Sequence, residues 1–128
     1  MSDTEKITIN LGVVDLGQID LLVERGFYSN RTDFIRMAIR NQISTHSDEI
    51  KEAANHWQLV VGSTTYNHEG LEEIRQQDEV LRIGVIGSLV LEDDVTPELA
   101  LATIKSIRVL GSFRASDEVK EALAERLK

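Results

Sequence analysis

The chain has 128 residues, of which 41% are hydrophobic and 28% are charged, so it has room for one ordinary domain or two very small ones and is expected to fold. It has no cysteine, no apolar run long enough to cross a bilayer and a polar start, which exclude disulfides and cysteine chemistry and predict a cytoplasmic protein outside the membrane. The formal net charge of −8 argues against indiscriminate nucleic-acid binding. Residues 1–45 hold five basic and six acidic side chains, whereas the remainder carries −7, so we expect the two parts to have different partners.

Residues 6–11 alternate strictly between apolar and polar side chains, the pattern of a half-buried β-strand. The apolar face carries Ile7, Ile9 and Leu11. The polar face carries Lys6, Thr8 and Asn10.

Two amphipathic helices are expected after this strand. Apolar residues recur at helical spacing from residue 13 to residue 23, and Gly26 is a natural C-terminal stop for that helix. A polar cluster at residues 27–33 is rich in capping residues and precedes a second amphipathic stripe at residues 34–43. The segment is therefore predicted to form a strand, a helix, a turn and a second helix.

A single strand of about six residues cannot stand alone, because its backbone groups would lack partners. No second alternating run lies in this segment, so the simplest partner is the same strand of another copy of the chain. This pairing would give a two-stranded antiparallel ribbon and an obligate two-fold dimer, with the helices of both copies on one face. The other face would present the polar side chains on a ribbon of a size that enters the DNA major groove.

Residues 6–43, about a third of the chain, resemble the ribbon-helix-helix (CopG/MetJ/Arc-type) family of bacterial DNA-binding proteins. The resemblance is carried by the strand at residues 6–11 and by residues 25–36, which are similar to the family's glycine turn and the start of its second helix. It implies that the outward strand residues Lys6, Thr8 and Asn10 contact bases. It also implies that a backbone phosphate is held by Ser29, Asn30, Arg31 and Thr32. A helix N-terminus with an adjacent arginine suits a phosphate, and Asn and Lys suit adenine and guanine edges.

Residues 46–56 are polar and helix-permissive, so we expect the second helix to continue through them as a connector between a domain at 1–45 and a domain at 57–128. In the second domain, Gly-Ser pairs begin at residues 62, 87 and 111, each within a short apolar run. Helices are expected after these runs, at residues 69–81, 96–107 and 116–127. The whole chain is thus predicted to be α+β, with a C-terminal short β/α repeat of three strand-turn-helix units, a parallel sheet, and a glycine turn ending each strand.

A ferredoxin-like ligand domain, as in the nickel-responsive relatives of the family, is the alternative architecture, and the repeat period argues against it. The three histidines occur at no metal-ligand spacing, so we expect no metal and no cofactor. The open ends of a short repeat array need covering. We expect self-association within the dimer or into tetramers, in preference to binding of another protein. Trp57 is expected to be a core or domain-interface residue.

These patterns predict a sequence-specific transcriptional regulator, a repressor that binds double-stranded operator DNA as paired dimers. One alternative is an antitoxin that represses its own operon, and another is a scaffold protein that assembles through its C-terminal repeats. An enzyme is not expected, because the sequence has no nucleophile-histidine-acid order, paired-carboxylate arrangement, phosphate-binding loop or dinucleotide-binding motif.

Overall fold

The computed structural model describes residues 4–128, so the first three residues of the predicted N-terminal domain lie outside the described part. The chain divides into two compact units, which are described separately: residues 6–51, and residues 52–128 together with Thr4 and Glu5. Within the described residues, no helix combines the length and apolar character needed to cross a membrane.

The first helix of the N-terminal unit, α1 (Val13–Glu24), ends as the sequence predicts. Gly26 adopts a positive φ of 85°, a conformation that glycine reaches without strain. The backbone N–H of Gly26 donates to the carbonyl of Val23, and the N–H of Phe27 donates to the carbonyl of Leu22. These two bonds form a Schellman motif, so the prediction that Gly26 stops the helix is confirmed.

The second helix, α2 (Arg31–Thr45), begins after Asn30 and ends at His46. A separate helix, α3 (Ser47–Trp57), follows. The expectation that the second helix continues through residues 46–56 is therefore wrong: the segment is helical, but the helix is interrupted at His46. The division between the two compact units falls within α3, and the domain bounds inferred from the sequence stay a prediction.

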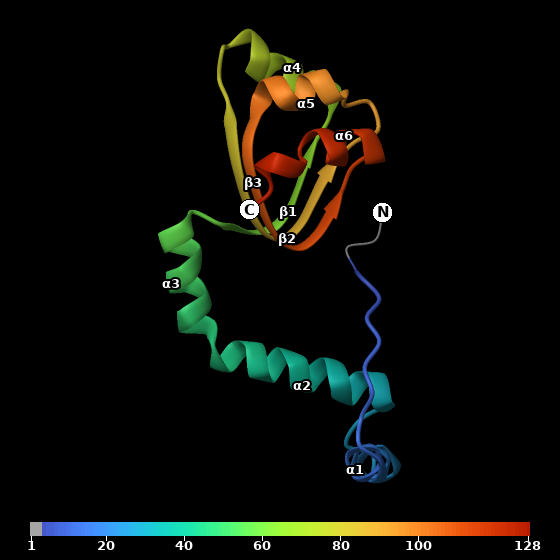
Figure 1. The fold of residues 1–128 in the computed structure, drawn as a ribbon. Coiled ribbons are helices and arrows are strands. Elements are labelled where there is room, and N and C mark those ends of the chain that lie inside the picture. Colours follow the sequence, from blue (N-terminus) through green and yellow to red (C-terminus); the bar gives the residue numbers. More distant parts are fainter. Residues whose placement is uncertain (1–3) are drawn as a thin grey trace. The chain divides into compact units, whose positions relative to one another are not determined.

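The C-terminal unit contains a three-stranded parallel sheet in the order β1-β2-β3, in which each strand is followed by a helix (Figure 1). The strands are β1 (Val60–Tyr66), β2 (Leu81–Leu91) and β3 (Ile104–Arg114). The helices are α4 (His68–Gln76), α5 (Pro97–Thr103) and α6 (Asp117–Ala122), with a short 3-10 turn at Ala124–Arg126. The parallel sheet expected from the repeat is present, and its neighbouring strands are consecutive along the chain.

The element boundaries in this unit differ from the prediction. Leu81, Ile104 and Ile107 were expected at the ends of helices, but all three lie in strands. The spacing of three between Ile104 and Ile107 suits a helix face, yet this segment pairs with β2, and both side chains are completely buried. Tertiary contacts therefore override the local pattern, and the strands are longer and the helices shorter than expected.

Three glycines face one another across the middle of the sheet. Gly62 pairs with Gly87, and Gly87 pairs with Gly111. Their φ angles are 137°, 140° and 126°, so each bends its strand in a conformation that other residues rarely adopt. The prediction that these glycines end their strands in tight turns is wrong, because each strand continues beyond its glycine. Figure 1 shows the strands bending part-way along, and the in-register glycine row accounts for the bend.

The hydrophobic core lies on the concave side of this bent sheet, where α4, α5 and α6 pack (Figure 1). Thr96, with Pro97 in the first turn, caps α5, and Ser116 caps α6, as the sequence indicates. The fully buried side chains include Leu71 of α4, Leu99 of α5 and Leu123 after α6. The C-terminal unit therefore has a core of its own.

Candidate nucleic-acid interface

The predicted ribbon segment is exposed in the single chain. Residues 4–12 form no helix and pair with no strand of the same chain, and each of them is exposed. The apolar residues Ile7 and Ile9 are 75% and 58% exposed to solvent. Because a ribbon built from two copies cannot form within one chain, the strand and the base-contacting roles of Lys6, Thr8 and Asn10 stay predictions.

Exposed apolar side chains continue through both helices of the N-terminal unit. Within the described residues 6–51, Ile19 is the one large hydrophobic residue that is buried. The exposed ones are Ile7, Ile9, Leu11, Val13, Val14, Leu21, Phe27, Met37, Ile39 and Ile43. A soluble monomer rarely shows so much apolar surface in so few residues, and such a surface marks an interaction site.

The start of α2 is fixed by a pair of reciprocal hydrogen bonds. The Asp33 backbone N–H donates to Asn30 Oδ1 at 2.8 Å, and the Ser29 N–H donates to Asp33 Oδ2 at 2.9 Å. This arrangement resembles a capping box, in which side chains satisfy backbone donors at both sides of the helix start. The Tyr28 ring packs edge-on against Phe34, with ring centroids 4.9 Å apart, and fixes the path of the chain into the helix.

These hydrogen bonds leave some backbone N–H groups at the start of α2 without a partner inside the helix. The first N–H groups of a helix have no intrahelical acceptor, and Asn30 satisfies that of Asp33. Because α2 begins at Arg31, the N–H groups of Arg31 and Thr32 also have no intrahelical acceptor. Of the four predicted phosphate-binding residues, the structure therefore brings Ser29, Asn30, Arg31 and Thr32 together, but the Asn30 side chain serves as the helix cap.

Arg31 is held by an acidic residue of the preceding helix. Its Nε donates to Asp20 Oδ1 and its Nη2 donates to Asp20 Oδ2, both at 2.8 Å. The hydrogen bonds and the charge of Arg31 lower the pKa of Asp20, and Asp20 in turn raises the pKa of Arg31. Both side chains remain about half exposed, so the guanidinium is oriented but accessible.

The sequence interpretation missed two carboxylates near the helix start. Asp33 carries a usable signal, because a capping residue followed three positions later by an acidic residue is the spacing of a capping box. Asp20 carries none, since it lies eleven residues before Arg31 on a different helix. A phosphate bound here must approach a site that already contains two negative charges.

The histidines and Trp57 form no metal-binding cluster in the part of the chain that the structure describes. Among residues 4–128, no group of three or more histidine or acidic side chains is placed to hold a metal ion. His46 lies at the C-terminal end of α2 and His68 in the first turn of α4, where its N–H donates to Asp94. Trp57 is not in the core, because the residue is 57% exposed.

Comparison with known proteins places these features in context. Residues 2–120 match the Ribbon-Helix-Helix transcriptional regulator family. A curated relative is the transcriptional regulator CdrS of Halobacterium salinarum, which is 34% identical over 56 residues. These residues are 44% of this chain and 98% of the relative. The relative is archaeal, so the bacterial origin expected from the resemblance stays untested. No solved structure matches the chain.

Proposed function

Because the chain belongs to the ribbon-helix-helix transcriptional regulator family, we propose that it is a dimeric regulator that binds specific DNA sequences with a two-stranded ribbon. The ribbon would be formed by residues 6–11 of two copies. The family comprises transcriptional regulators, which gives no support to an enzymatic role.

The observation that carries this proposal is the exposed apolar surface of residues 6–51. A second copy would cover Ile7, Ile9 and Leu11 against the helices, where burial of each such side chain contributes about 1.5–3 kcal/mol. Because side chains alternate between the two faces of a strand, this burial also determines which side chains point away from the helices. With the apolar side chains turned toward the helices, Lys6, Thr8 and Asn10 of both copies face the opposite side.

Each outward side chain suits a part of the major groove. Asn10 can contact the adenine N6 and N7 atoms, and Lys6 can donate to guanine O6 and N7. Thr8 offers a hydroxyl and a methyl group. The start of α2 would hold a phosphate through the N–H groups of Arg31 and Thr32, supported by the Arg31 guanidinium and the helix dipole.

When the protein binds DNA, Arg31 would either release Asp20 or bind Asp20 and a phosphate together. Its bidentate bond uses Nε and Nη2 and leaves Nη1 for a phosphate oxygen. Asp20 thus acts as an internal competitor for the same guanidinium. We propose that this competition weakens non-specific binding, because a non-specific complex depends on phosphate contacts alone.

The C-terminal unit favours a regulator over an antitoxin. A segment that neutralises a toxin would commonly be disordered alone, whereas residues 52–128 form a sheet and three helices around a core. Within the described chain, β1 is paired on one side, and Val60 and Val61 at this edge are exposed. We propose that this edge joins copies of the chain into tetramers and that the protein represses transcription by occupying its operator as paired dimers.

The test is fluorescence-anisotropy binding to DNA from the protein's own promoter and to scrambled DNA, over a salt series, with the mass of each complex measured in parallel. Selective binding by dimers or paired dimers is expected. Asn10→Ala should cost about 1–3 kcal/mol on the promoter DNA and little on scrambled DNA. Arg31→Ala should weaken binding to both and reduce the salt slope by about one phosphate contact.

Two results would contradict the proposal. Equal losses on both DNAs for Asn10→Ala would remove it from the base-reading face. The absence of binding to either DNA would make residues 6–11 a dimerisation element and would favour a scaffold protein instead.

A further inference from the structure

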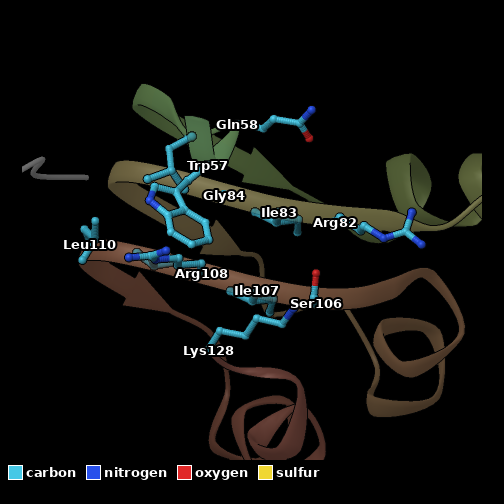
Figure 2. A pocket seen from close by; sticks show the side chains of 12 residues that line it. Trp57, Gln58, Arg82, Ile83, Gly84, Ser106, Ile107, Arg108, Leu110 and Lys128 are labelled. Carbon is cyan, nitrogen blue, oxygen red and sulfur yellow. The ribbon is translucent and has the colours of Figure 1, made fainter. Parts of the chain in front are cut away.

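The C-terminal unit contains a pocket that DNA binding by the ribbon does not explain. It has a volume of about 470 Å³ and lies on the face of the sheet outside the helices, between the end of α3, the beginnings of β2 and β3, and Lys128 (Figure 2). Pockets for small molecules commonly have volumes of about 300–1,000 Å³. The space is therefore large enough for a small organic ligand.

The floor and walls of the pocket follow from the alternation of the two strands. Arg82 and Gly84 of β2 pair with Ser106 and Arg108 of β3, and these four residues share one face of the sheet. An added Cβ at Gly84 would lie 2.8 Å from Leu59 Cδ2 and 3.2 Å from the Gln58 carbonyl oxygen, so a side chain here would press against the segment after α3. The missing side chain lets the segment after α3 cross the sheet closely and form one wall.

Trp57 and Arg108 form the centre of the pocket. The Arg108 guanidinium carbon lies 5.1 Å from the centroid of the Trp57 ring, and Figure 2 shows the indole above Arg108. Stacking on an aromatic face positions a guanidinium without using its in-plane N–H donors. Among the described residues no carboxylate is paired with Arg108, so these donors remain available for an anion.

The charge of the pocket contrasts with that of the unit. Residues 52–128 are rich in acidic side chains, yet none of the twelve lining residues is acidic. Elsewhere in this unit Arg75 is paired with Glu72, and Arg126 donates to the carbonyls of Leu101 and Ile104. Five basic side chains among residues 52–128 have no hydrogen bond or ion pair: Arg82, Lys105, Arg108, Lys120 and Lys128. Three of these five, Arg82, Arg108 and Lys128, line the pocket.

We propose that this pocket binds a small organic anion, with a carboxylate or phosphate held by Arg108 and an apolar body lying against Trp57 and Leu110. Ser106 adds a hydroxyl donor, and Arg82 supplies a second guanidinium at the other end of the pocket (Figure 2). A small molecule is favoured over the DNA backbone because the basic residues line a concavity that the apolar residues Trp57, Leu59 and Leu110 also line. The site is independent of the ribbon and does not rest on DNA binding.

The chain provides its own reporter, because Trp57 is the single tryptophan. The full-length protein is titrated with phenyl phosphate and with benzoate while Trp57 emission is recorded, and calorimetry provides a readout that does not depend on fluorescence. Benzyl alcohol has the aromatic ring without the negative charge. Inorganic phosphate has the negative charge without the ring. Saturable binding of at least one of the two aromatic anions is expected, with a dissociation constant on the order of millimolar for probes of this size. Their relative affinities show which anionic group the site prefers.

Matched variants distinguish binding in the pocket from a general effect of the protein's net charge. Arg108→Gln should weaken binding about tenfold or more, because it removes a charged donor group at the site. Lys105→Gln removes the same charge from the same strand at an exposed position outside the pocket lining, and should change binding less than about twofold. Arg108→Lys keeps the charge without the planar fork and should lie between them. Unfolding curves of each variant establish that the fold is retained.

Four outcomes would overturn the proposal. The first is equal binding of benzyl alcohol and the aromatic anions, which would make the pocket a purely apolar one. The second is an equal loss in Arg108→Gln and Lys105→Gln, which would reduce the effect to net charge. The third is the absence of saturable binding of either anion. The fourth is a loss of affinity for scrambled DNA in Arg108→Gln without competition by either probe, which would assign this face to the DNA backbone.

Discussion

The glycine row at the centre of the sheet offers the sharpest test of the fold. Gly87→Ala would place a Cβ 2.1 Å from the Gly62 carbonyl oxygen, whereas real Cβ contacts essentially never fall below 3.0 Å. Gly62 provides the matched control. Its φ of 137° is almost the same as the 140° of Gly87, but an added Cβ there meets nothing within 4 Å. The pair therefore separates backbone strain from steric overlap.

The two variants should differ by about 2 kcal/mol in the free energy of unfolding. The unusual backbone conformation alone costs about 1–3 kcal/mol for a residue with a side chain, and this applies to Gly62→Ala and Gly87→Ala equally. In Gly87→Ala, β1 and β2 must also separate by about 0.9 Å, which weakens the hydrogen bonds next to the contact. Each such bond contributes about 0.5–1.5 kcal/mol. We expect a loss of about 2 kcal/mol for Gly62→Ala and about 4 kcal/mol for Gly87→Ala.

Urea unfolding followed by circular dichroism, at one protein concentration for both variants, measures this difference. The effect of alanine on the unfolded chain is common to both variants and cancels in the comparison. If Gly62→Ala were as destabilising as Gly87→Ala, the clash with the neighbouring strand could not be the cause. A loss below about 1 kcal/mol for Gly87→Ala would show that the glycine row is not required.

Other predictions concern the helix starts and the core. The Arg31 guanidinium lowers the pKa of Asp20, so their contribution to stability is complete above about pH 4 and is lost as the pH falls through the lowered folded pKa. The pH dependence of unfolding should therefore be shallower below about pH 4 in Asp20→Asn, and an unchanged slope would contradict the pairing. Asn30→Ala removes the cap of α2 and should cost about 1 kcal/mol in thermal unfolding, with a smaller loss if water replaces the cap. Leu123→Ala empties a fully buried site and should cost about 2–5 kcal/mol, whereas Leu101→Ala at a partly exposed site should cost clearly less; equal losses would place Leu123 outside the core.

Local signals in the sequence were sufficient for the N-terminal helices. Gly26 and Asn30 act on backbone groups only a few residues away, so composition and spacing contain the information needed to place the end of α1 and the start of α2. The interruption at His46 was not anticipated, because the residues around it are all compatible with a continuous helix.

The C-terminal unit shows where local patterns are ambiguous. The repeat of the Gly-Ser pairs correctly indicated three parallel strands, since repeated spacing reflects repeated structure. The role of the glycines could not be inferred, because a positive φ serves a turn as readily as a bend within a strand. The contact that distinguishes the two possibilities lies between residues 25 positions apart, Gly62 and Gly87.

The candidate sites depend even more on contacts that are distant in the sequence. Asp20 reaches Arg31 across the turn between two helices, and Trp57 reaches Arg108 across fifty-one residues. No spacing rule relates these residues. The sequence could identify the start of α2 as a phosphate-binding candidate, but it could not reveal the carboxylate that competes for Arg31 or the cations that gather beside Trp57.

The glycine row also determines which changes in chain length the C-terminal unit can tolerate. Successive glycines are separated by 25 and 24 residues, yet they remain in register. The irregularity between Leu81 and Arg82, where Lys105 is the additional residue on the opposite strand, lies at the beginning of the strands and not beside the glycines. An insertion in the connections around α4 or α5 would leave every glycine opposite its partner. An insertion inside a strand would set a side chain against a carbonyl and turn the inward residues outward. Relatives of this chain should therefore vary in length in the helical connections and keep a constant number of residues around each glycine.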